Sequence, residues 1–188
     1  MQNEPSIEPV FHSSNVRIAQ IKFVIISFIC VLILTLINNL IFSHASLLTE
    51  LLVCLAIISL FYFYIDEDTT NIVSGMLLWT AAIFIAYLSW RKNGLYDTAI
   101  IAFPCLLMFA SMIGGRLLML PLVSFMVLCC YFFVYATESG LLVHQVGIDK
   151  ESLWGKANNI TILLLTYAFI IQHVSAKFNT LLQAYIEE

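Results

Sequence analysis

Side chains that could carry out chemistry are few in this sequence and widely separated. His44 and His144 both fall in connections between apolar runs, where paired histidines can bind a metal or respond to pH. Their spacing matches no metal-ligand pattern, and the sequence holds no phosphate-binding loop, zinc motif or nucleophile triad. The cysteines all lie inside apolar runs, which indicates small buried hydrophobic residues rather than disulfides; they are Cys30, Cys54, Cys105, Cys129 and Cys130. We therefore predict no catalytic residue, no metal site and no cofactor.

Polar residues inside apolar runs are the next candidates, because a polar side chain in lipid is costly and often functional. Asn38 and Asn39 lie late in the first apolar run, and Gln172 and His173 lie late in the last one. The simplest role of all four is hydrogen bonding between helices. We also take Asn38 and Asn39 as candidates for a ligand pocket, and Gln172 and His173 as candidates for signal relay at the membrane edge.

Aromatic residues gather in groups, one of which contains Trp79, Tyr87 and Trp90. Such groups usually form the belt at the membrane–water interface or face the lipid. The alternative is that these three residues line an outward-facing pocket for an apolar or aromatic small molecule. Asp97 and Pro104, which follow closely in the sequence, are the further pocket candidates.

The composition excludes most classes of protein. The chain has 188 residues, of which 61% are hydrophobic and 11% are charged, whereas a soluble domain has about 45–50% apolar and about 25% charged residues. A polytopic membrane protein in contact with lipid is the class that fits. The net charge of −4 and the absence of a basic patch argue against a nucleic-acid partner.

The elements that must position these residues are apolar helices. Six runs are apolar enough to be read as spans, and they cover residues 21–42, 47–65, 72–90, 98–113, 117–136 and 160–176. All connections are short except 137–159, so neighbouring helices should be antiparallel. The predicted fold is an all-α membrane protein with a six-helix transmembrane bundle. It comprises a cytoplasmic segment (1–20), the transmembrane domain (21–176) and the start of a cytoplasmic helix (177–188).

Charge alone does not orient this bundle. With a cytoplasmic N-terminus, the positively charged residues divide four to four; Arg17, Lys22, Arg116 and Lys177 lie inside, and Arg91, Lys92, Lys150 and Lys156 lie outside. Arg17 and Lys22 flank the first helix, which usually dominates orientation. We therefore expect a bacterial inner-membrane protein with both termini in the cytoplasm.

The most specific local pattern begins at Gly94. This glycine can form the turn after the third span, and Asp97 can cap the fourth helix by accepting its free backbone N–H groups. Pro104 lacks an N–H, so the carbonyl of Ile100 should lose its usual partner and the helix should kink. A kink of this kind would open a small polar spot inside the bundle.

Residues 94–116 resemble a pattern in the six-span N-terminal membrane sensor (MASE-like) domains of bacterial diguanylate cyclases and sensor histidine kinases. Gly94, Asp97, Phe103 and Pro104 match that pattern, and Glu138 with Gly140 resembles the acidic-Gly ending of the same unit. The sequence departs from it at residues 66–68, which are acidic where such domains often carry basic residues. The resemblance implies a sensory domain that precedes a cytoplasmic output module.

The last helix carries an apolar stripe with the heptad spacing of a packed helix pair; the stripe consists of Leu164, Tyr167, Ile171, Val174, Phe178, Leu181 and Tyr185. Within the membrane nearly every residue is apolar, so only Phe178, Leu181 and Tyr185 discriminate. We expect this helix to form a homodimeric cytoplasmic coiled coil that leads to an output domain beyond Glu188. The alternative is a single amphipathic helix at the interface, although its polar face lacks Lys and Arg after Lys177.

These patterns favour a membrane-embedded sensory domain that relays a ligand or membrane signal through its dimeric sixth helix. Phe178, Leu181 and Tyr185 would join Gln172 and His173 as relay residues, and the ligand would be an unknown small or apolar molecule. A small polytopic transporter or channel subunit is the rival interpretation. Transporters often carry internal repeats and charges near the membrane midplane, and neither is evident here. A structural subunit is the third possibility.

Overall fold

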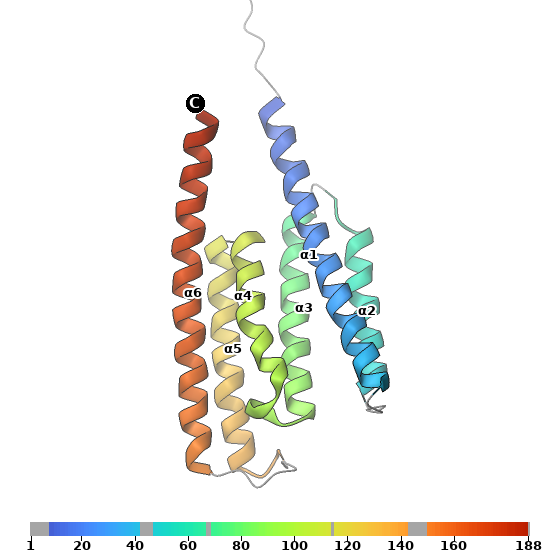
Figure 1. Cartoon of the computed structure of the whole chain (residues 1–188), viewed down its shortest axis with the longest axis vertical. Coiled ribbons are helices and arrows are strands. Elements are labelled where there is room, and N and C mark those ends of the chain that lie inside the picture. Colours follow the sequence, from blue (N-terminus) through green and yellow to red (C-terminus); the bar gives the residue numbers. More distant parts are fainter. Residues whose placement is uncertain (1–7, 42–46, 67–68, 114, 143–149, 188) are drawn as a thin grey trace, which may run out of the picture. The chain divides into compact units, whose positions relative to one another are not determined.

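The computed structural model describes residues 8–41, 47–66, 69–113, 115–142 and 150–187, and every regular element within them is helical. This confirms the predicted all-α class. The elements in chain order (Figure 1) are α1 (Glu8–Ile41), α2 (Leu48–Phe63), α3 (Thr70–Arg91), η2 (Gly94–Tyr96), η3 (Thr98–Ile101), α4 (Ala102–Ile113), α5 (Gly115–Glu138) and α6 (Lys150–Glu187), where η marks a 3₁₀ helix.

Four helices in the described part of the chain are long and apolar enough to cross a membrane; their apolar stretches are Ile21–Ile41, Thr70–Arg91, Leu118–Glu138 and Ser152–Val174. Two further apolar stretches, Leu48–Phe63 and Thr98–Ser111, are shorter. The 16 residues of α2 rise about 24 Å, whereas the hydrocarbon core is about 30 Å thick. Helices of these lengths and compositions are those of a helical membrane protein.

The chain divides into two units, Met1–Leu77 and Leu78–Glu188, and α3 runs from the first into the second. In the first unit α1 and α2 pack side by side (Figure 1). Buried residues recur on α2 at steps of three and four, at Leu51, Cys54 and Ile58, which is the spacing of one helix face. The ammonium of Lys22 on α1 lies 5.8 Å from the centre of the Tyr62 ring on α2.

In the second unit α4, α5 and α6 all pack against one another. The fully buried residues that form this core are Phe103, Leu106 and Leu107 of α4, Met119, Leu122 and Met126 of α5, and Leu153, Ala157 and Leu164 of α6. The second half of α3 joins this core through ring contacts with α5. Trp79 meets Phe125 edge to face at 5.3 Å, and Trp90 stacks on Phe132 at 5.5 Å.

The start of α6 differs from the prediction. Residues 137–159 were expected to form a connecting loop, but α6 already begins at Lys150. Leu153 and Ala157 are buried and continue the spacing of Thr161, Leu164 and Ala168, so one face of the polar stretch is part of the core. Among the polar residues that lower the hydropathy of this stretch, Ser152, Asn158 and Asn159 are exposed and Lys156 is half-buried.

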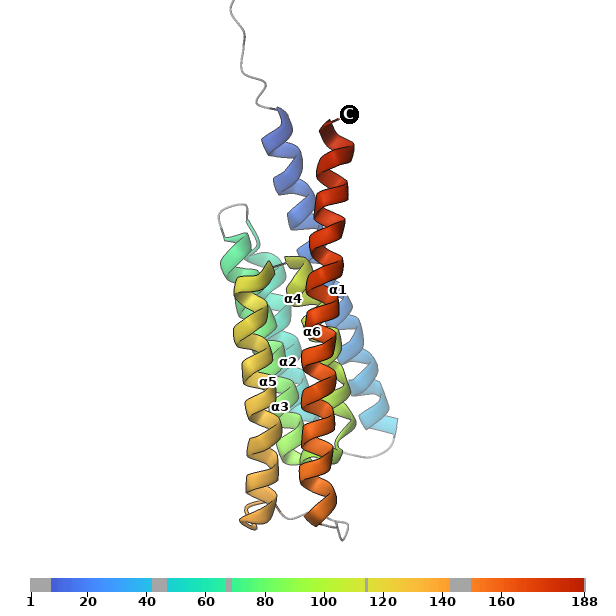
Figure 2. The ribbon, with the colours of Figure 1, turned by 90° about the vertical axis from the view of Figure 1, so that its left-hand side faces the viewer.

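The helix predicted for residues 177–188 is the far end of α6, described as far as Glu187. The helix continues past Lys177 to Glu187 without a break. Figure 1 and Figure 2 both show that it extends well beyond the ends of α4 and α5, within the same unit. A single helix therefore runs from the packed core of this unit to Glu187, beyond the ends of α4 and α5.

Candidate functional site

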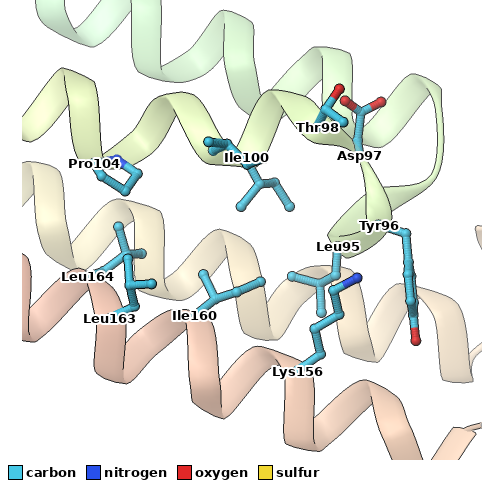
Figure 3. A pocket seen from close by; sticks show the side chains of 11 residues that line it. Leu95, Tyr96, Asp97, Thr98, Ile100, Pro104, Lys156, Ile160, Leu163 and Leu164 are labelled. Carbon is cyan, nitrogen blue, oxygen red and sulfur yellow. The ribbon is translucent and has the colours of Figure 1, made fainter.

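The second unit contains a cavity of about 300 Å³ that is partly open to the surroundings. It lies between the 3₁₀ segments with the beginning of α4 on one side and the first half of α6 on the other (Figure 3). Its lining residues are Leu95, Tyr96, Asp97, Thr98, Ile100, Ile101, Pro104, Lys156, Ile160, Leu163 and Leu164. A volume of about 300 Å³ is at the lower end of the range for small-molecule sites.

The 3₁₀ segments owe their shape to two residues. Gly94 adopts a φ of 58° and is buried, a combination that favours glycine because a β-carbon is strained in this region of the backbone map. Asp97 then sits between η2 and η3, and its Oδ1 accepts a 2.7 Å hydrogen bond from the N–H of Ala99. The predicted turn and cap are both present, but Asp97 caps a 3₁₀ helix rather than an α-helix.

The sequence predicted that Pro104 lies about one turn into the fourth helix and kinks it; in the structure that first turn is a separate 3₁₀ segment. The stretch from Thr98 to Ile101 forms a 3₁₀ turn, and Pro104 is the third residue of the α-helix that begins at Ala102. A proline is tolerated in the first turn of a helix, where its missing N–H has no partner in any case. The ring instead forms part of the cavity wall.

The polar end of the cavity is built around Tyr96. Its hydroxyl shares a 2.9 Å hydrogen bond with Ser152 Oγ, and Lys156 Nζ lies 3.5 Å from the centre of its ring. Ser152 and Lys156 are four residues apart and therefore project from the same side of α6. One tyrosine thus connects η2 to the beginning of α6 and holds the lysine ammonium at the end of the cavity (Figure 3).

The remaining walls are apolar. Ile100 and Pro104 face Ile160, Leu163 and Leu164 across the cavity (Figure 3). Leu164 is completely buried, whereas Leu163 is 55% exposed. Ile101, on the opposite wall, is 71% exposed. The cavity therefore reaches from the core of the unit to its apolar outer surface.

A second set of contacts fixes the beginning of α6 against the end of α5. The indole Nε1 of Trp154 donates a 2.5 Å hydrogen bond to Glu138 Oε1, and the Tyr131 hydroxyl donates a 2.9 Å bond to Asn158 Oδ1. The Trp154 and Tyr131 rings are 6.2 Å apart. Tryptophan and tyrosine with exposed polar atoms are typical of the membrane–water interface. This level of the unit is consequently the one expected to lie at the lipid headgroups.

The predicted pocket residues are only partly brought together. Asp97 and Pro104 both line the cavity. Trp79 and Trp90 lie elsewhere, with their rings against phenylalanines of α5, and Tyr87 is 41% exposed on α3 without lining the cavity.

Asn38 and Asn39 belong to α1 in the other unit. Asn39 is buried and donates from Nδ2 to the Thr35 carbonyl of its own helix at 2.8 Å, rather than to a neighbouring helix. Asn38 is exposed.

The predicted relay residues all belong to α6. Gln172 is half-buried and His173 is exposed, at the end of the apolar stretch that closes at Val174. Phe178, Leu181 and Tyr185 lie on the helical backbone, but their side chains are outside the described part of the structure. His44 and His144 also lie outside the described residues. Among the residues that are described, no three His, Cys, Asp or Glu side chains lie close enough to hold a metal ion.

Sequence reasoning missed the residues that give the cavity its polar end. Lys156 was assigned to a loop, and Tyr96 was not considered as a site residue. Ser152, Lys156 and Ile160 recur every four residues, which is a helical spacing, but two of the three are polar, so hydropathy does not mark this face. Comparisons of the chain with protein-family models, with curated proteins and with solved structures give no match.

Proposed function

We propose that this chain is a membrane-embedded sensory domain in which α6 carries the signal out of the bilayer. The observation that supports this role is that α6 supplies one wall of the cavity and continues as the same helix to Glu187. Lys156, Ile160, Leu163 and Leu164 lie on that wall. A ligand in the cavity would therefore contact the element that projects beyond the packed core.

The signal in this proposal is a two-state change in the packing of α6 against α4. A ligand shifts such an equilibrium only by its difference in affinity between the two states. Leu164 is completely buried and packs beside the cavity. Filling the cavity would favour the state in which α6 lies farther from Pro104, and the displacement would appear at the far end of the helix.

The projecting end would act as a dimer. Along the predicted stripe the exposure rises from 0% at Leu164 to 60% at Val174, so the stripe is covered by the same chain at first and uncovered later. An exposed apolar stripe with heptad spacing is suited to pairing with a second copy. The proposal places Phe178, Leu181 and Tyr185 in a homodimeric cytoplasmic coiled coil.

The rest of the proposed architecture follows from the sequence. All six apolar stretches would span a bacterial inner membrane, with both termini in the cytoplasm. The output would be a cytoplasmic domain of diguanylate cyclase or histidine kinase type, as implied by the resemblance at Gly94, Asp97, Phe103 and Pro104.

Disulfide crosslinking of the full chain in membranes tests this proposal. Single cysteines at Phe178, Leu181 and Tyr185 are introduced after the five native cysteines are replaced. Cysteines at Asn179 and Gln183 serve as controls on other faces of the helix. The proposal expects dimers at the first three positions and few at the two controls. Equal crosslinking at all five positions would contradict the coiled coil.

A matched pair of variants then tests the relay. Ile160→Phe adds volume inside the cavity, whereas Ile162→Phe adds the same volume at a residue that is 62% exposed and does not line it. We expect Ile160→Phe alone to change the rate of crosslinking at Leu181. Identical rates in both variants would contradict the relay. Robust solute flux through liposomes containing the chain would instead favour a transporter or channel.

A further inference from the structure

We infer that the cavity binds one acyl chain of an anionic membrane phospholipid, with the lipid phosphate held by Lys156. The inference names the ligand of the same cavity, so the effect of that ligand on signalling rests on the proposed sensory role. Binding itself is independent of any relay and is measured separately.

The charge next to the cavity is that of Lys156. Lys156 is half-buried and lines the cavity, and its ammonium contacts the face of the Tyr96 ring. An ammonium has three donors, and within the described residues the Lys156 ammonium forms no ion pair. The other charged residue of the lining, Asp97, is 9% exposed and already accepts the Ala99 N–H. The charge that a ligand can reach is therefore positive, which favours an anionic headgroup.

The position of Lys156 along α6 matches the depth of a lipid headgroup. Lys156 lies four residues inside the apolar stretch that begins at Ser152, or about 6 Å along the helix axis. Trp154 and Tyr131 occupy the same level with their polar atoms hydrogen-bonded. A lysine at this depth reaches the headgroup layer with its flexible side chain. A phospholipid phosphate lies in that layer, so its position matches that of the ammonium.

The size and lining of the cavity suit a single acyl chain. A cavity of 300 Å³ holds about ten groups of the size of a water molecule, each of about 30 Å³, which suits a single medium-length stretch of acyl chain. The walls formed by Ile160, Leu163 and Pro104 are apolar along this length. The exposed residues Ile101 and Leu163 lie at the outer surface, so the second acyl chain can remain in the bilayer. This opening favours a bilayer phospholipid over a free single-chain acid.

Photolabelling of the full chain in vesicles tests the inference. Vesicles of phosphatidylcholine are doped with phosphatidylglycerol that carries a photoreactive diazirine in one acyl chain. A second arm uses the same chain on phosphatidylcholine, and a third uses it as the free fatty acid. Mass spectrometry locates the label. We expect phosphatidylglycerol to label residues 95–104 and 156–164 most strongly.

Variants of the lysine identify the headgroup contact. Lys156→Gln should lower labelling by phosphatidylglycerol about fivefold, the effect of one basic residue near an anionic surface, whereas Lys156→Arg should retain it. Lys92→Gln removes an exposed lysine that does not line the cavity and should change nothing. Ile160→Phe, compared with Ile162→Phe, should reduce labelling whatever the headgroup.

The outcomes separate this inference from the proposed function. Equal labelling by the two phospholipids, insensitivity to Lys156→Gln, or stronger labelling by the free fatty acid would overturn the inference. Selective labelling by phosphatidylglycerol, with no change of crosslinking at Leu181 in Ile160→Phe, would support the lipid site and contradict the relay. A change of crosslinking at Leu181 without selective labelling by phosphatidylglycerol would support the relay and contradict the lipid site.

Discussion

The ammonium of Lys156 lies 3.5 Å from the centre of the Tyr96 ring, and the hydroxyl of that ring bonds to Ser152 at 2.9 Å. The tyrosine therefore contacts two successive turns of α6 with two different parts of its side chain. It comes from the 3₁₀ segment η2, which also packs against α5. This pair of contacts joins the turn after α3 to the helix that forms the opposite wall of the cavity.

Removing these two contacts one after the other should lower the free energy of unfolding in two steps. Tyr96→Phe keeps the ring over Lys156 and should lower the free energy of unfolding by about 1 kcal/mol, the usual value of one hydrogen bond. Tyr96→Leu also removes the cation–π contact, which adds about 0.5–1 kcal/mol at a partly exposed site. Thermal unfolding in detergent measures both. Tyr135→Phe, at a tyrosine that is 62% exposed, is the control; equal effects at Tyr96 and Tyr135 would refute the contact.

The hydrogen bond by which Asp97 caps η3 should contribute more to stability than the charge of its carboxylate. Asp97→Ala leaves the Ala99 N–H without its 2.7 Å partner and should cost about 1 kcal/mol. Asp97→Asn keeps a side-chain oxygen and should cost much less, because asparagine is a comparable cap. Hydrogen exchange at the Ala99 amide reports the loss directly. If alanine and asparagine accelerate exchange equally, the carboxylate charge matters more than the cap.

Two glycines should respond to alanine in opposite directions. Gly94 has a φ of 58°, so Gly94→Ala should destabilise the protein by about 1–2 kcal/mol through backbone strain. Gly155 lies within α6, and nothing stands within 4 Å of the place that a β-carbon would occupy. Gly155→Ala should therefore stabilise the protein by about 0.5–1 kcal/mol. Unfolding curves that shift in the same direction for both variants would contradict this assignment.

The residues that sequence reasoning placed correctly are those whose roles are local. Gly94 and Asp97 act through backbone atoms within three residues, and these patterns can be seen in a single line of sequence. Phe103, which carried part of the family resemblance, is completely buried. Gly94, Asp97 and Phe103 thus each have a structural role in this chain.

The parts that could not be predicted depend on residues far apart in the chain. Tyr96 and Ser152 meet across 56 positions, and no local pattern links them. The start of α6 was missed because hydropathy averages all faces of a helix, and among the side chains described in its first two turns Leu153 and Ala157 alone are buried. A membrane helix with a polar beginning is identified only when its packing partner is known.

A buried hydroxyl in α3 should be dispensable. Ser89 is completely buried, and within the described residues its Oγ has no hydrogen-bond partner. An unsatisfied polar group costs about 1–3 kcal/mol, so Ser89→Ala should raise the free energy of unfolding by about 1 kcal/mol. Ser111 offers the matched control, because its Oγ donates to the Met108 carbonyl at 2.9 Å. Ser111→Ala should be destabilising; a loss of stability in Ser89→Ala as well would indicate a partner for that hydroxyl.

The short helix α2 provides the sharpest test of the six-span arrangement. Its 16 residues rise about 24 Å, about 6 Å less than the hydrocarbon core, a mismatch that local thinning of the bilayer and anchoring residues can accommodate. Thr49 and Asp66 are exposed at its two ends. If α2 spans the membrane, a single cysteine at one of these positions should react with an impermeant maleimide in intact cells, and a single cysteine at the other only after the cells are opened. Labelling of both from one side would mean that α2 enters and leaves by the same face, and the arrangement with six spans would be wrong.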